Sequence, residues 1–257
     1  EFLMKKFTLL FVLTVLSLFA SNVWAQNLIF VNVSDDVSIA QAETPYTLWY
    51  EVHRWGVKHG YSFSNSGREG SDGIDGEKPT GSMQPVTNIS WRDAMVWCNA
   101  ASERDSYTPV YMDGDKVLKS ADTNKEGEGR AENATVNESA NGYRLPTKAE
   151  WLLAARGGDE AASITTDIKI SSWVAENSNN STHEIKTRGG NLIGLYDMSG
   201  NVWEMVYDSW RVNNDHRLIL GGSFKKNAAD ATIEAEDSVV ASQSYNDVGF
   251  RLARNVK

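Results

Sequence analysis

Cysteine is almost absent from this sequence. The one cysteine among 257 residues is Cys98, so no disulfide can form within the chain and no pair of thiolates can hold a metal or share a redox step. Histidine is also scarce, and His53, His59, His183 and His216 show no close spacing. An iron or zinc site made of neighbouring histidines is therefore not expected. Stability must come from packing or from bound ions.

The sequence has fewer basic than acidic residues. The chain has 25 lysines and arginines against 34 aspartates and glutamates, and its net charge is −9. Proteins that bind nucleic acids draw their affinity from clustered lysine and arginine side chains that neutralise phosphates. No nucleic-acid partner is expected.

Long apolar runs are missing except at the N-terminus. The run from Phe7 to Ala20 is about fourteen residues long, shorter than the ~20 residues of a membrane-spanning helix. Two lysines precede it, and Val23-Trp24-Ala25 is typical of a cleavage site. Residues 1–25 are therefore predicted to be an N-terminal extension and signal peptide.

The predicted signal peptide implies export. We expect a protein that is secreted or displayed at the cell surface, for example at an outer membrane. A lipid anchor would need a cysteine where Ser21 stands. If Ser21 replaces a native cysteine, the protein associates with the membrane through an N-terminal lipid.

Apolar periodicity predicts three helices. The first is expected to begin with Thr44 as its cap and Pro45 as its first residue, and to end at Gly60. Ser90 and Asp93 form a capping box ahead of the second helix, whose apolar face includes Cys98. Thr147 and Glu150 form another box ahead of the third.

The remaining chain favours short strands and loops. Residues 28–33 are typical of a strand, and residues 62–82 of a long loop. Residues 111–140 are charged and predict a solvated insert or hairpin. From Trp173 onward, short apolar pieces predict irregular loops and short antiparallel strands. No repeat or linker divides the chain, so residues 26–257 are predicted to be a single α+β domain.

Several segments together resemble the formylglycine-generating enzyme, or sulfatase-modifying factor, family. These segments are QPVTNISWRDAMVWCN (84–99), NGYRLPTKAEWLLAARGG (141–158), GLYDMSGNVWE (194–204), LGGSF (220–224) and GFRLAR (249–254). The resemblance implies a C-type-lectin-like fold, with two main helices beside small antiparallel sheets and much irregular loop. We name 220–224 and 249–254 the C-terminal frame.

The resemblance also implies what this chain has lost. The resembled enzymes oxidise a cysteine of a target protein and need two cysteines of their own, one of them in a CRxAxR-like stretch after the GGS motif. Here that stretch, 231–236, is ATIEAE. The related ergothioneine-pathway oxygenases hold iron in a histidine cluster that this sequence also lacks. We therefore expect no redox cofactor and no catalytic residues.

A second resemblance is to variable proteins of diversity-generating retroelements, the Treponema variable protein type in particular. Such proteins use the same fold and diversify the residues between the two halves of the frame to bind new ligands. The residues between the halves here are KKNAADATIEAEDSVVASQSYNDV (225–248), and the chain ends three residues after GFRLAR. A non-diversified paralogue that lost catalysis is the alternative, and the low asparagine content of 225–248 favours it.

The predicted binding region is about 208–250. Exposed positions that combine aromatic contact area with charge are the expected ligand contacts. They are Trp210, Arg211, Lys225, Lys226, Asp230, Glu234, Glu236 and Tyr245.

Calcium is the metal that the resemblance implies. Asp197 and Glu204, with the backbone carbonyls of Gly200 and Val202, match positions that coordinate calcium in the resembled enzyme, and hard oxygen ligands suit Ca²⁺. The alternative is that Asp197 makes an Asx turn and Glu204 a buried hydrogen bond. A bound ion would stiffen the loops in place of disulfides.

Three hypotheses of function follow. The first is an exported, non-catalytic binding protein, a monomer with a protein or glycan ligand. The second is an enzyme of this family with unknown chemistry, and the third is a structural component of the cell envelope.

Overall fold

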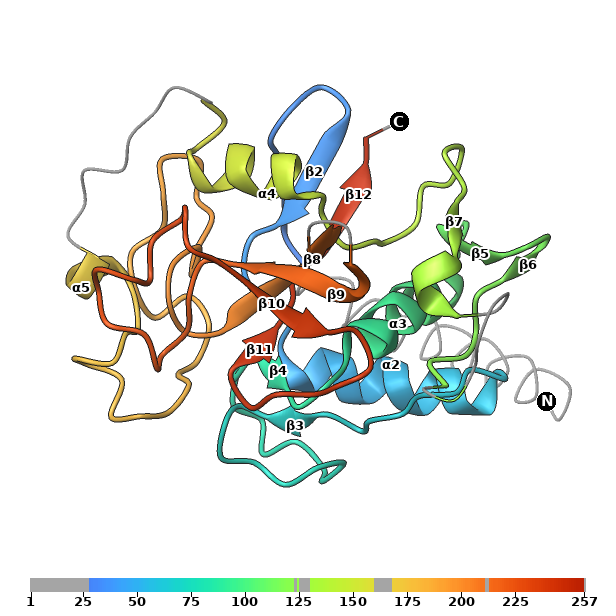
Figure 1. Ribbon diagram of the computed structural model, residues 1–257, viewed down its shortest axis with the longest axis horizontal. Helices are drawn as coiled ribbons and strands as arrows, with labels where there is room; N and C mark the ends of the chain where they lie inside the picture. The colour runs from blue at the N-terminus through green and yellow to red at the C-terminus, as the bar shows by residue number, and fades with distance from the viewer. Residues whose placement is uncertain (1–27, 123, 125–129, 160–167, 211–212, 257) are drawn as a thin grey trace, which may run out of the picture.

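The computed structural model describes residues 28–122, 124, 130–159, 168–210 and 213–256. The predicted extension and signal peptide (1–25) and the candidate contact Arg211 lie outside them. Figure 1 shows two long helices packed side by side at one end of the molecule and the long C-terminal strands crossing its middle. Within the described residues, no helix has the length and apolar character needed to cross a membrane.

The two main helices are α2 (Tyr46–Lys58) and α3 (Trp91–Arg104). α3 begins as predicted, because the Ser90 hydroxyl accepts the backbone N–H of Asp93 and the Asp93 carboxylate accepts that of Ser90. α2 begins one residue later than predicted, with Pro45 as its N-cap. The reason is tertiary: the N–H and carbonyl of Thr44 bond to Phe250 and Val86, which keeps this part of the chain extended.

Shorter helical segments complete the helical part of the fold. α4 (Lys148–Ala155) has the predicted capping box, with Thr147 and Glu150 satisfying each other's backbone N–H groups. The other two are the short helix α5 (Ile168–Ser171) and the 3-10 helix η2 (Ala131–Asn133).

Two sheets contain the longer strands. An antiparallel three-stranded sheet has the order β1-β2-β12, made of β1 (Phe30–Asn32), β2 (Val37–Ala40) and β12 (Ala253–Asn255). A four-stranded sheet has the order β10-β9-β8-β11, made of β10 (Glu236–Val240), β9 (Asn213–Leu220), β8 (Trp203–Trp210) and β11 (Val248–Gly249). β11 pairs parallel to β8, so this sheet is mixed and not purely antiparallel as predicted.

Two small sheets include strands from the stretches predicted to be loop and insert. One pairs β3 (Arg68–Glu69) with β4 (Val86–Thr87). The other has the order β6-β5-β7, with β5 (Tyr111–Asp113), β6 (Lys116–Val117) and β7 (Thr135–Val136). The predicted hairpin in 111–140 is thus confirmed.

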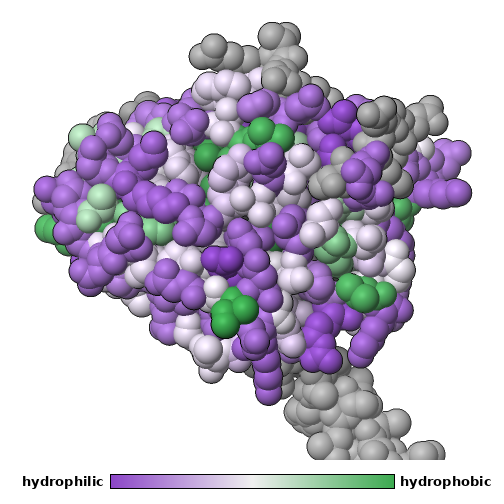
Figure 2. Space-filling view, turned by 60° about the horizontal axis from the view of Figure 1, so that its bottom comes forward, coloured by the Kyte–Doolittle hydropathy of each residue, from purple (hydrophilic) through white to green (hydrophobic). Residues whose placement is uncertain are grey.

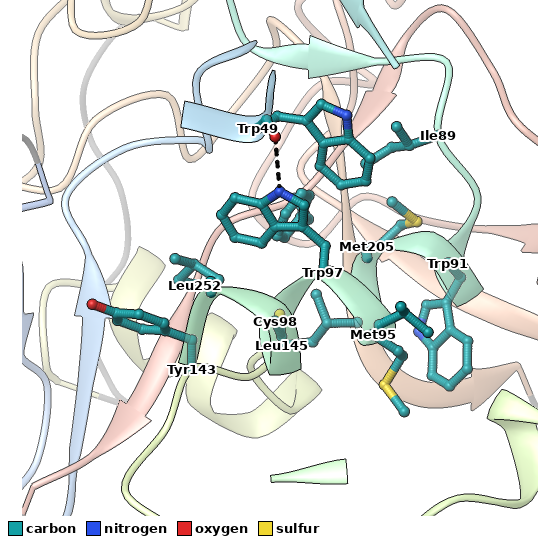
Figure 3. Close-up of a cluster of buried hydrophobic side chains, with 14 of the residues drawn as sticks. Trp49, Ile89, Trp91, Met95, Trp97, Cys98, Tyr143, Leu145, Met205 and Leu252 are labelled. Atoms are coloured by element: carbon teal, nitrogen blue, oxygen red, sulfur yellow. Dashed lines mark hydrogen bonds between the residues drawn. The ribbon is translucent and has the colours of Figure 1, made fainter. Parts of the chain in front are cut away.

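Aromatic side chains dominate the core between α2 and α3. The rings of Trp49 and Trp97 stack with centroids 5.6 Å apart, and the Trp97 indole N–H donates to the Trp49 carbonyl. Figure 3 shows this pair with Cys98 and Leu252 close by. Each fully buried large side chain contributes roughly 1.5–3 kcal/mol. This packing anchors the C-terminal frame, because Phe250 meets both tryptophan rings edge-on.

Candidate ligand-binding surface

Two glycines shape the chain at the start of the C-terminal frame. Gly221 and Gly222 have φ angles of +89° and +80°, in the left-handed region that favours glycine. A Cβ on Gly222 would lie 2.6 Å from the Cα of Ala231, so the chain after Phe224 folds back against this turn. Ala231 is fully buried there. The stretch that carries a cysteine in the resembled enzymes therefore begins with a small, inert side chain.

Lys225 and Lys226 project from the loop after the glycines. The Lys225 ammonium lies 3.2 Å from a carboxylate oxygen of Asp247 and donates to the side-chain oxygen of Asn246. The Lys226 ammonium lies 5.6 Å from the centre of the Trp203 ring. No ion pair joins Lys226 to a carboxylate among the described residues. The loop thus presents one paired and one unpaired cation.

A stack of three side chains lies next to this loop. The imidazole of His183 covers one face of Trp173 at 3.6 Å between ring centroids, and the Arg188 guanidinium carbon lies 3.8 Å from the same ring centroid. The Ala175 N–H donates to the Lys226 carbonyl, which joins the stack to the lysine loop. We name Trp173, His183, Arg188, Lys225 and Lys226 the Trp173 surface.

Arg188 has capacity for a further partner. Its Nε is buried without a hydrogen-bond partner, and within the described part of the chain no carboxylate pairs with its guanidinium. A buried donor without an acceptor costs free energy, and the half-buried guanidinium keeps part of its surface open to solvent. The Trp173 ring is held in place by a hydrogen bond from its N–H to the Thr187 hydroxyl. An anion beside this ring would meet a positioned guanidinium.

The other candidate contacts are spread over separate places. Glu234 and Glu236 face α4, where they pair with Arg156 at 3.8 Å and with Lys148. Trp210 is half-buried against the apolar cluster around Trp151. The remaining two are Asp230, which is exposed and accepts from Asn227, and Tyr245, which is half-buried on the larger core.

A fully buried ion pair supports the frame from inside. The Arg251 guanidinium contacts both carboxylate oxygens of Glu204, at 2.5 and 2.6 Å. The Trp151 indole N–H also donates to Glu204, at 2.6 Å. The remaining guanidinium donors reach the carbonyls of Ala40 and Tyr196. One side chain thereby joins β2, β8 and the GFRLAR segment.

A second acidic group lies beside this pair. Glu43 is buried and accepts from the Asn201 side chain and the Val202 N–H. Burial raises the pKa of Glu43 well above its ordinary value, and the carboxylates of Asp197 and Glu204 raise it further. The interior thus gathers the carboxyl groups of Glu43, Asp197 and Glu204 around the Arg251 guanidinium, and burial favours the protonated form of Glu43.

The predicted calcium ligands lie in this cluster. Asp197 accepts the Lys186 N–H through Oδ2 at 2.8 Å, while its buried Oδ1 has no partner. Burial raises the pKa of Asp197 to about 6. Glu204 is already engaged by Arg251 on both oxygens. Within the described residues, no group of three or more His, Cys, Asp or Glu side chains is placed to hold a metal. Of the two predicted carboxylate ligands, only Asp197, through Oδ1, keeps an oxygen without a partner among the described residues.

Cys98 lies away from the Trp173 surface, in the interior of α3. It is fully buried, and burial raises the pKa of its thiol. Thiolates, not thiols, are the reactive species. Cys98 is therefore suited to packing, as its position on the apolar helix face predicted.

The face drawn in Figure 2 is mainly hydrophilic, with small and separate apolar spots. A broad apolar interface on this face is therefore not supported. Recognition by charge and by single aromatic rings suits such a surface better.

Comparison with known proteins agrees with this architecture. Residues 37–256 match the family described as sulfatase-modifying factor enzyme 1-like domain. The chain is 31% identical over 210 residues to the chaperone protein LppX of Paenibacillus barcinonensis, covering 71% of this chain and 75% of that protein. The crystal structure of CarF superposes with a TM-score of 0.73 and 30% identity, over 86% of this chain and 87% of that one. Treponema denticola variable protein 1 superposes with a TM-score of 0.65 and 26% identity, over 86% of this chain and 84% of that one.

The fold and these matches define the class of protein. It has the C-type-lectin-like fold of the formylglycine-generating enzyme type, which confirms the predicted α+β fold. The chain belongs to the family of sulfatase-modifying factor enzyme 1-like domains.

Sequence reasoning missed the stack on Trp173. From the sequence, His183 is considered only as a possible metal ligand, and Arg188 is not among the predicted contacts. The segment 173–188 has no periodicity that would bring these side chains together. The available signal was Trp173, an aromatic residue followed by basic residues in a stretch rich in glycine and asparagine.

Proposed function

We propose that this protein is an exported, non-catalytic binding protein that recognises an anionic group of a protein or glycan through the Trp173 surface. The observation that carries the proposal is the pair of cations, Arg188 and Lys226, that lie against tryptophan rings and have no carboxylate partner among the residues that the structure describes. In a chain of net charge −9, such cations favour a negatively charged ligand.

The thiol chemistry supports binding without turnover. Cys98 is buried, and Ala231 packs against Gly222 where the resembled enzymes carry a cysteine. A single buried thiol offers neither a ligand pair for copper nor an accessible nucleophile. The relative from Paenibacillus barcinonensis is named a chaperone, which supports a protein as the ligand. We propose that the protein acts as a monomer.

We further propose that residues 208–250 form an adaptable region. In 225–248, buried anchors such as Ile233 and Val239 alternate with exposed side chains, so the exposed positions can change while the frame persists. The similarity to a Treponema variable protein supports this. An imperfect copy of these codons beside the gene, differing mainly at adenines and near a reverse transcriptase, would establish diversification. Its absence would favour the plain paralogue.

The binding proposal is tested with a printed array of peptides and glycans. We expect the exported protein to select anionic features, and the double variant Arg188→Glu/Lys226→Glu to lose this binding at least about tenfold. The matched control is Lys58→Glu/Lys116→Glu, which makes the same charge change at two exposed lysines elsewhere. Equal loss in both variants, or retention in the first, would contradict the assignment of the surface.

The two other hypotheses have their own tests. Turnover of thiol peptides by protein supplied with copper or iron under oxygen would favour an enzyme of this family. A structural role in the envelope would instead predict stable association with other envelope proteins whatever the charge at Arg188 and Lys226.

A further inference from the structure

A pocket of about 440 Å³ lies apart from the Trp173 surface. It is bounded by the turn before β2, the end of β12, β7 and the chain that leads into α4. Figure 1 shows β2 and β12 side by side, and Arg144 in the chain before α4 bridges to Ala253 in β12. Ligand pockets in proteins commonly have volumes of roughly 300–1,000 Å³. The lining residues are Asp36, Val37, Tyr111, Val136, Glu138, Arg144, Leu145, Thr147, Glu150, Tyr207, Asn255 and Val256.

The single guanidinium of the pocket wall has no free donor. Arg144 bonds to both carboxylate oxygens of Glu150, at 2.7 and 2.8 Å. It also donates twice to the Asn255 side chain and once to the Leu145 carbonyl. Five N–H groups thus meet five contacts. The Arg144–Glu150 pair is neutral overall and leaves no N–H group for an anionic ligand.

Two further carboxylates lie at the rim of the pocket. Asp36 and Glu138 are exposed, line the pocket and have no ion-pair partner among the described residues. Because Arg144 is balanced by Glu150, these two groups leave the pocket with an excess of negative charge. The complementary ligand carries positive charge.

The floor of the pocket is aromatic and apolar. The rings of Tyr111 and Tyr207 stack with centroids 5.8 Å apart and 12° between their planes. The Tyr111 hydroxyl is engaged by the Leu145 N–H at 2.9 Å. Phenol rings attract cations through their faces, and the side chains of Val37 and Val136 accommodate an apolar stem.

We propose that this pocket binds an organic cation with an apolar stem, such as an amine or the side chain of a lysine. The cationic head lies between Asp36 and Glu138, and the stem lies over Tyr207. The site differs from the Trp173 surface in position and in charge, so it stands whether or not that surface binds an anion.

The test is a ligand-observed NMR titration with three probes. Benzylamine supplies the cation and stem, benzyl alcohol the same shape without charge, and acetyl-Gly-Lys-Gly-amide a lysine side chain within a peptide. We expect benzylamine to bind saturably and at least about fivefold more tightly than benzyl alcohol. Comparable binding of the peptide identifies a protein side chain as the source, and binding of benzylamine alone identifies a free amine.

Variants locate the site. Asp36→Asn/Glu138→Gln is expected to weaken benzylamine binding about fivefold or more, while Glu51→Gln/Asp115→Asn, which neutralises two exposed carboxylates elsewhere, leaves it unchanged. Tyr207→Leu weakens binding and Tyr207→Phe retains it. The proposal is overturned by equal affinity for the charged and neutral probes, by insensitivity to the rim variant, or by no saturable binding of either cation below ~10 mM.

Discussion

Arg251, in the GFRLAR motif, stabilises the fold through a buried ion pair with Glu204. Its guanidinium and the Glu204 carboxylate are 0% and 1% exposed. Removing one partner of a buried pair leaves a charge without compensation, which typically costs about 3–5 kcal/mol. We therefore expect Arg251→Met to lower the free energy of unfolding by that amount, measured by urea denaturation.

The control for this substitution is a surface pair on the same chain. Lys119 and Glu103 are 2.8 Å apart with 35% and 28% of their side chains exposed. Lys119→Met should cost less than about 1 kcal/mol. If both variants lost the same stability, the bracing role of Arg251 would be rejected.

Glu150 provides a prediction for acidic pH. Burial acts to raise its pKa, but the hydrogen bonds and charge of Arg144 outweigh burial, so the pKa is lowered. A carboxyl with a lowered folded pKa contributes stability above its unfolded pKa of about 4.3, and this is lost as the pH falls through its folded pKa. Glu150→Gln, which retains a capping side chain, should cost about 1 kcal/mol at pH 7. Urea titrations at several pH values should show that difference shrinking below about pH 4; a constant difference would refute it.

The prediction that calcium binds can be tested at Asp197. Its buried Oδ1 is the carboxylate oxygen free to meet an ion, and few charged ligands imply millimolar affinity. Millimolar calcium should raise the Tm of the wild-type protein by a few degrees relative to EGTA, and Asp197→Asn should remove that increase. An increase that survives in the variant would place the ion elsewhere; none in the wild type would leave Asp197 as a structural residue.

At the scale of elements, the cap of α3 differs from a simple helix cap. Asp93 closes the box with Ser90 and also accepts from the backbone of Ser64 at 2.7 Å and the side chain of Asn65. Ser90→Ala should therefore cost about 1 kcal/mol. Asp93→Ala should cost about 2 kcal/mol, because it also removes the acceptor of the partly buried donors at Ser64 and Asn65. Equal losses in urea denaturation would show that Asp93 acts only as a cap.

The elements that could be predicted are those specified locally. The boxes at Ser90 and Thr147 involve residues three apart, so the sequence alone predicts where α3 and α4 begin. The start of α2 depends on Phe250 and Val86, far away in the chain, and was displaced by one residue. β8 and β9 are eight residues each, longer than the short strands expected, because cross-strand pairing with a bulge extends them beyond any clear alternation.

The position of the candidate surface could be predicted in outline, but the side chains that surround it could not. The frame motifs indicated where the exposed loop lies, and Lys225 and Lys226 do project from it. Their neighbours come from 173–188, through contacts that no sequence period encodes. Glu234 and Glu236 were chosen by the same alternation, yet they face α4.

At the scale of the whole molecule, a family scaffold is kept by packing and buried ion pairs while its surface carries charge and aromatic rings. The scaffold matches family structures over 86% of the chain. Its one thiol lies buried in the core, on α3 beside Leu145 (Figure 3). We propose that such a molecule recognises ligands and leaves them chemically unchanged.

The most direct test is mass spectrometry of a cysteine-containing peptide incubated with the protein, copper and oxygen. For a protein that only binds, we expect the peptide mass to stay that of the copper-only control. Conversion of the peptide thiol to an aldehyde in the presence of the protein, beyond that control, would contradict it.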